Sequence, residues 1–195
     1  MKRPIFALST ALTFFAGPAL AHTGAGPASG LAAGFSHPIM GLDHVLAMVA
    51  VGLLAAQLGG RARWAVPAAF VAAMVVASVA AVNGVALPLV EFGIAGSVIV
   101  LGAAIAFGRR LPVAGAMALV GVFALFHGHA HGTEMPATVA GLTYGLGFVA
   151  ATAGLHVAGL GLATVSIRAS ARLAPLVLRI GGALVAAAGL VLASA

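Results

Sequence analysis

The sequence contains no cysteine and very few charged residues. Without thiolates, disulfides are excluded, and a bound metal ion would need His, Asp, Glu or Met as ligands. Only 6% of the 195 residues are charged and 63% are hydrophobic, and the mean hydropathy is +1.20. Such a chain has too few polar residues to cover a soluble domain, so the composition predicts an integral membrane protein.

The long apolar runs also lack the two-residue alternation that membrane β-barrels require, which favours helices. A helix needs about 20 apolar residues to cross the bilayer. The expected fold class is all-α, a polytopic membrane helical bundle of six transmembrane helices. The six expected spans cover roughly residues 38–58, 64–82, 87–107, 112–131, 137–161 and 173–194.

The N-terminal region precedes the first expected span and divides into two segments. Residues 1–21 combine a basic start, a short apolar run and a small-residue cleavage pattern at Ala19-Leu20-Ala21, which predicts a cleavable secretory signal peptide. An uncleaved first helix is the alternative. Residues 22–36 are rich in Gly, Ala and Pro without apolar periodicity, so we expect a loosely packed periplasmic arm. Residues 37–195 then form the transmembrane domain.

The formal net charge of +6 comes from residues in short turns, not from a basic tract with interleaved aromatics, so we expect no nucleic-acid partner. Arginines occupy alternate turns, which the positive-inside rule places in the cytoplasm. Both mature termini are then periplasmic, in agreement with a signal peptide, and the expected location is a bacterial inner membrane. These turn residues are Arg61, Arg63, Arg109, Arg110, Arg168 and Arg172.

The first chemically distinctive motif begins at His37 and places ionisable groups in an otherwise apolar span. Such groups are costly in lipid and usually mark function. On one continuous helix, His37 and His44 would lie within about 20° of each other, with Met48 on the same face. Asp43 either orients a histidine, as carboxylates beside metal-bound imidazoles do, or points to another helix. A purely structural His–Asp pair is the alternative.

The second motif lies at the end of the fourth span and contains His127, His129, His131 and Glu134. In a helix, His127, His131 and Glu134 share one face, with His129 opposite. If the intervening glycines unwind the segment, the alternating histidines could instead converge from an extended chain. Either conformation gathers groups that bind nickel, cobalt, copper or zinc. A helix-end or pH-sensing role is the alternative.

The predicted topology brings the two motifs to the same depth. At about 1.5 Å per residue, Asp43 and His44 lie roughly 10 Å below the outer surface, level with the outward-running fourth span. Glu91, at the start of the third span, is a further candidate at this depth or else an interfacial residue. His156 lies nearer the cytoplasm, where it is either an inner relay or a structural histidine.

The two motifs also resemble those of a known family. The stretch HPIMGLDHVLAM from His37, followed by Val51-Gly52, closely resembles the signature of the HupE/UreJ family, and FHGHAHGTE from Phe126 looks like its second motif. The resemblance implies nickel or cobalt uptake by a secondary permease, often for hydrogenase or urease maturation. His22, near the predicted cleavage site, also resembles the family pattern. The implied ligands are His37, Asp43, His44, His127, His131 and Glu134.

The leading hypothesis is therefore a non-enzymatic permease that imports Ni²⁺ or Co²⁺. The ion is the transported substrate, and no permanent cofactor is expected. The other expected partner is membrane lipid, and the sequence is compatible with a homo-oligomer. Two alternatives stay open: a His-box membrane metalloenzyme, and a metal-binding maturation partner that does not transport. Further candidate ligands are His22, Met48, Glu91, His129 and His156.

Overall fold

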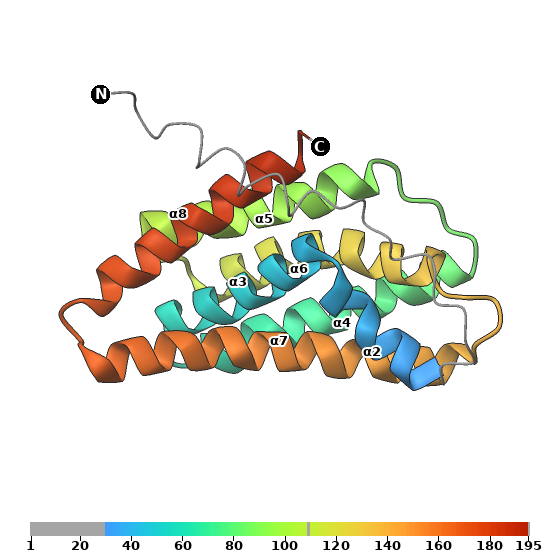
Figure 1. Ribbon diagram of the computed structural model, residues 1–195, viewed down its shortest axis with the longest axis horizontal. Helices are drawn as coiled ribbons and strands as arrows, with labels where there is room; N and C mark the ends of the chain where they lie inside the picture. The colour runs from blue at the N-terminus through green and yellow to red at the C-terminus, as the bar shows by residue number, and fades with distance from the viewer. Residues whose placement is uncertain (1–29, 109, 195) are drawn as a thin grey trace, which may run out of the picture.

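The computed structural model describes residues 30–108 and 110–194, and within them every regular element is an α-helix. This confirms the all-α membrane fold. The predicted signal peptide and His22 lie outside the described residues. The helices, shown in Figure 1, are α2 (Gly30–Met40), α3 (Leu42–Leu58), α4 (Ala62–Val82), α5 (Val90–Phe107), α6 (Val113–Thr133), α7 (Gly141–Ala169) and α8 (Ala174–Leu192).

Five of these helices, α4 to α8, are each long and apolar enough to cross a membrane, with mean hydropathies from 1.6 to 2.3. Helices α2 and α3 meet this criterion only as a pair, and they are bent by 83° relative to each other. The described chain therefore has five candidate spans, or six if the bent pair is one broken span. Each of the six predicted segments corresponds to helix in the structure.

The expectation that His37 and His44 share one continuous helix is wrong, because the first span breaks at Gly41. This residue has an extended backbone, with φ −90° and ψ 116°. Glycine is a poor helix former, and a Cβ atom here would lie 2.8 Å from Asp43 Oδ1 and 3.2 Å from His44 Nδ1. The break therefore leaves the space that the Asp43–His44 pair occupies.

The loosely packed arm predicted for residues 22–36 is also wrong for its described part. Residues from Gly30 onward form α2, which packs along α7 (Figure 1). Gly34 has no side chain, so its backbone can lie directly against the Tyr144 backbone. The small residues that suggested an unstructured arm instead permit close helix packing, which does not depend on apolar periodicity.

The remaining helices pack mainly in pairs, α4 with α6 and α5 with α8, while α3 packs on α7 (Figure 1). Close approach again depends on glycine, since a Cβ atom at Gly128 of α6 would overlap the Met74 carbonyl oxygen of α4. Large buried side chains such as Phe70, Leu54 and Leu101 fill the space between the helices. The α4–α6 pair holds the second histidine motif in place.

We predict that Gly128→Ala destabilises the protein, whereas Gly121→Ala on the same helix does not. The new methyl group at position 128 meets main chain that cannot rotate away, and overpacking of this kind costs about 1–3 kcal/mol. At Gly121 a Cβ atom would have no neighbour within 4 Å. Thermal melting in detergent, followed by circular dichroism, measures both changes. Equal melting temperatures for the two variants would contradict this packing.

Candidate metal site

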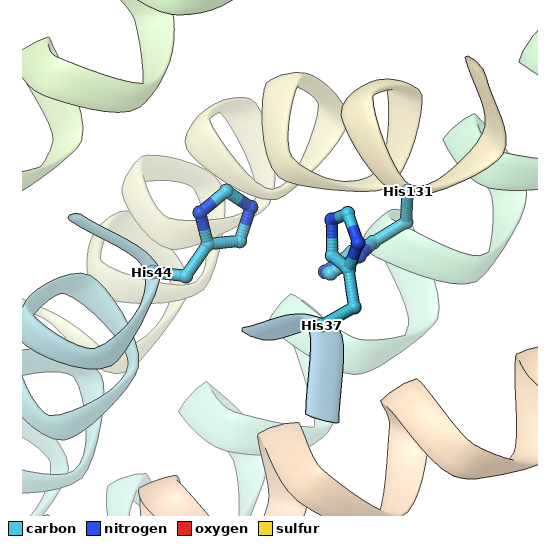
Figure 2. A group of neighbouring side chains, drawn as sticks. All are labelled: His37, His44 and His131. Carbon is cyan, nitrogen blue, oxygen red and sulfur yellow. The ribbon is translucent and has the colours of Figure 1, made fainter. Parts of the chain in front are cut away.

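Three histidines from three different helices meet in the interior of the bundle. His37 comes from α2, His44 from α3 and His131 from α6, and one ring nitrogen of each lies within 4.8 Å of the others. Figure 2 shows the three side chains turned toward a common region. Ring centroids are 4.8 Å apart for His37–His131 and 5.1 Å apart for His44–His131. The two motifs thus meet, as the predicted topology required.

The separation of these nitrogens suits a first-row transition-metal ion. Imidazole nitrogens bind such ions at about 2.0–2.1 Å, so two nitrogens sharing one ion lie at most roughly 4.2 Å apart. The three nitrogens therefore need to approach one another further for a single ion to bind all three. Within the described chain, both ring nitrogens of His131 are buried without a hydrogen-bond partner. Buried polar atoms are normally paired, so this arrangement indicates a ligand site.

Asp43 fixes the orientation of His44. Its Oδ1 atom accepts the His44 backbone N–H at 2.7 Å and lies 2.8 Å from His44 Nδ1. A carboxylate at this distance favours the proton on Nδ1, which leaves Nε2 as the nitrogen with a free lone pair. His44 Nε2 is buried and has no partner among the described residues. Of the two roles predicted for Asp43, the structure shows the orienting one.

Side chains around the cluster hold the other two rings. Nε2 of His37 lies 3.3 Å from Oε2 of Glu134, which directly follows α6. His131 stacks on Phe148 of α7, with ring centroids 4.7 Å apart and planes 5° from parallel. The Tyr144 ring lies 6.1 Å from that of His37. Two aromatic side chains of α7 therefore lie beside the rings of His37 and His131.

His127 lies one helical turn before His131 and is fully buried. Its ring is 4.7 Å from that of His44, and its Nε2 atom is 2.9 Å from Ser97 Oγ on α5. Because α6 stays helical through Thr133, His127 and His131 share one helical face, and the extended alternative is wrong. His127 therefore contacts His44 of the histidine cluster but is not one of its three members.

His129, on the opposite face of α6, is hydrogen-bonded to the loop between α4 and α5. Its Nε2 atom accepts a hydrogen bond from the Leu87 N–H at 3.1 Å and lies 3.0 Å from the Val85 carbonyl oxygen. A neutral imidazole has only one acceptor nitrogen. In His129 this nitrogen accepts the hydrogen bond from the loop. The structure therefore places His129 outside the cluster, where it fastens the connection between α4 and α5.

The remaining sequence candidates are not members of the set of three histidines. Met48 is fully buried within the hydrophobic core of the bundle, and Glu91 is exposed in the first turn of α5. His156 is buried on α7, and its ring lies 5.1 Å from that of Phe70. The Phe70 ring is also 5.7 Å from that of His127, so both histidines contact the same aromatic ring.

Sequence reasoning missed Ser97 and the aromatic residues that contact the histidines. Ser97 and Glu91 are the only polar side chains in α5, and a polar residue in a membrane helix is a usable signal. Phe70, Tyr144 and Phe148 carried no such signal, because aromatic residues are common in apolar spans. Only their positions in the folded chain connect them to the imidazoles.

Comparison with known proteins agrees with the two motifs. The sequence model of the HupE / UreJ protein family matches residues 10–192. A curated relative, Protein HupE from Rhizobium leguminosarum bv. viciae, is 46% identical over 183 residues, covering 93% of this chain and 94% of that protein. No solved structure matches the chain. With the family match spanning nearly all of the sequence, the chain belongs to the HupE/UreJ family.

Proposed function

We propose that this protein is a secondary permease that imports Ni²⁺ or Co²⁺ across a bacterial inner membrane. The observation that carries the proposal is the set of three imidazoles, His37, His44 and His131, whose donor nitrogens lie within 4.8 Å of one another inside the helical bundle. Ionisable groups are costly in an apolar interior, so the convergence of three histidines from three helices favours a functional site. The ion is the substrate of this site.

The donor set fits a borderline transition metal. Imidazole nitrogen suits nickel, cobalt, copper and zinc, while calcium and magnesium prefer oxygen ligands. Neutral imidazoles supported by few carboxylates bind the ion without the charge that would hold it permanently, and protonation releases it. Family membership favours nickel or cobalt within this group, and hydrogenase or urease maturation as the use of the imported metal.

The arrangement of the arginines supports inward transport. The helices that carry His44 and His131 have arginine-bearing turns at their far ends, at Arg61 after α3 and Arg110 before α6. By the positive-inside rule those turns are cytoplasmic. The opposite helix ends, which carry His44 and His131, therefore lie on the periplasmic side. In this proposal residues 1–21 are a signal peptide, residues 22–29 precede α2 outside the membrane, and both mature termini are periplasmic.

A route from the cluster toward the cytoplasm is marked by two further histidines. His127 lies one turn deeper than His131, about 6 Å along the axis of α6. His156 on α7 contacts the same Phe70 ring as His127 does. Among the described residues, His156 has no hydrogen-bond partner at either ring nitrogen. We assign these two side chains as successive binding positions on the path.

The membrane potential is a sufficient energy source for this movement. The sequence contains no phosphate-binding Gly-x-x-x-x-Gly-Lys-[Ser/Thr] loop, so nucleotide hydrolysis is not part of the proposal. Each elementary charge gains about 2.3 kcal/mol per 100 mV, so an inward-moving divalent ion gains about 4–5 kcal/mol. No additional coupling ion is required for accumulation.

The test is uptake of radioactive Ni²⁺ and Co²⁺ into liposomes containing the purified protein, with a potential negative inside. We expect His44→Ala to lower the initial rate at least about 10-fold, because the variant loses an imidazole of the cluster together with its Asp43 contact. Circular dichroism of the reconstituted variant verifies that it is folded. Equal uptake by wild type and variant would contradict the assignment of the cluster, and absence of uptake by the wild type would refute the permease. Tight binding without uptake would instead support a maturation partner.

A further inference from the structure

Ser97 is a buried hydroxyl in the otherwise apolar interior part of α5. Its side chain is fully shielded from solvent, and its Oγ atom has two close polar neighbours. Oγ lies 2.6 Å from the Ile94 carbonyl oxygen on its own helix and 2.9 Å from His127 Nε2 on α6. Both contacts are within hydrogen-bond distance, so one oxygen atom joins two helices.

Counting hydrogens determines the direction of both bonds. A serine hydroxyl has a single hydrogen to donate and two lone pairs that accept. The Ile94 carbonyl can only accept, so the hydroxyl hydrogen points to Ile94. The contact with His127 therefore requires that Nε2 carries the hydrogen and donates it to Ser97 Oγ.

This direction also determines the other ring nitrogen of His127. A neutral imidazole carries one N–H, so with Nε2 protonated the Nδ1 atom holds an unshared lone pair. Within the described chain, His127 Nδ1 is fully buried and has no hydrogen-bond partner. The opposite tautomer would bury an N–H without an acceptor and leave one hydroxyl hydrogen between two acceptors. The surroundings of the ring thus favour the Nε2–H form.

We propose that Ser97 is a positioning residue, which holds His127 in the Nε2–H tautomer so that Nδ1 is its metal donor. The inference rests on the proposed transport function and extends it to a residue outside the two histidine motifs. Asp43 acts on His44 in the opposite sense, by keeping Nε2 available. Two neighbouring imidazoles, with centroids 4.7 Å apart, therefore present different ring nitrogens to the ion. Their orientations are fixed before the metal arrives.

The first measurement is ¹⁵N NMR of histidine-labelled, metal-free protein in lipid bilayers at about pH 8, where ordinary imidazoles are neutral. The His127 signals are identified by their loss in His127→Gln. We expect a protonated Nε2 and an unprotonated Nδ1 in the wild type, and a mixture of tautomers in Ser97→Ala. A wild-type His127 with its hydrogen on Nδ1 would overturn the proposal without the use of any serine variant.

The second measurement is Ni²⁺ affinity by isothermal titration calorimetry. Removing a side chain that orients a metal-bound histidine typically weakens affinity about 10–100-fold, and we expect Ser97→Ala to fall near the lower value. Ser97→Thr keeps the hydroxyl and should restore both the tautomer and most of the affinity. Ser78→Ala, which alters a buried serine of α4, is the matched control and should bind as the wild type does.

The two measurements separate this inference from the transport proposal. Ser97→Ala with an unchanged tautomer and wild-type affinity would overturn the role of Ser97, even if the wild type transports normally. The expected tautomer and affinity changes in a protein that takes up no metal would contradict the permease and uphold Ser97 as a positioning residue of a binding site.

Discussion

Replacing His131 with alanine is expected to lower Ni²⁺ affinity by more than about 100-fold, beyond the roughly 10–100-fold typical for loss of a supporting partner. His131 is the central member of the cluster, since its ring lies 4.8 Å from that of His37 and 5.1 Å from that of His44. Both of its ring nitrogens lack partners within the described structure. Without it, the remaining two histidines of the cluster are 6.0 Å apart by centroid.

The matched control is His129→Ala, which removes an identical side chain two residues earlier on the same helix. His129 bonds to the loop between α4 and α5, so this variant should keep Ni²⁺ affinity within about twofold. It should instead lose about 1 kcal/mol of stability, the usual net value of one hydrogen bond. Isothermal titration calorimetry and thermal melting of both variants give the comparison. Similar affinities for the two would contradict the assignment of the cluster.

Asp43→Asn is expected to weaken Ni²⁺ binding about 10–100-fold while leaving the melting temperature nearly unchanged. Asparagine has the shape of aspartate, and its oxygen can accept the same two N–H groups of His44 that Oδ1 now accepts. It has no negative charge, so it makes His44 less basic and does not attract the cation. We therefore expect the fold to be preserved and only the basicity of the His44 imidazole and the local negative charge to change.

The same calorimetric titration tests this second prediction, with circular dichroism as the check on folding. Asp43→Ala should be worse than Asp43→Asn, because it also frees the His44 ring to rotate. An Asp43→Asn protein that binds Ni²⁺ within about twofold of the wild type would show that the carboxylate only orients the ring and that its charge has no effect.

The two errors in the sequence-based expectations have separate physical origins. Periodicity arguments assume an uninterrupted helix, and on that assumption His37 and His44 lie on one face. In the structure their ring centroids lie 6.0 Å apart across an 83° bend. The two rings are therefore close because the span bends between them, not because they share a helix face. Glycine-rich sequence before His37 suggested an arm, although close helix packing in membranes requires the same small residues.

Composition by itself determined the all-α membrane fold, because a chain with so few charges must satisfy its backbone groups within apolar helices. The clustered histidines indicated the region of the candidate site, and the family resemblance was readable from the same residues. Only the tertiary structure decided that His129 serves a loop, that Glu91 is exposed, and that Ser97 contacts His127. Each of these depends on contacts between distant segments, which local sequence patterns do not encode. The helix break at Gly41 was also decided by the tertiary structure. The space at this glycine is filled by the Asp43 and His44 side chains, whose orientation is known only from the folded chain.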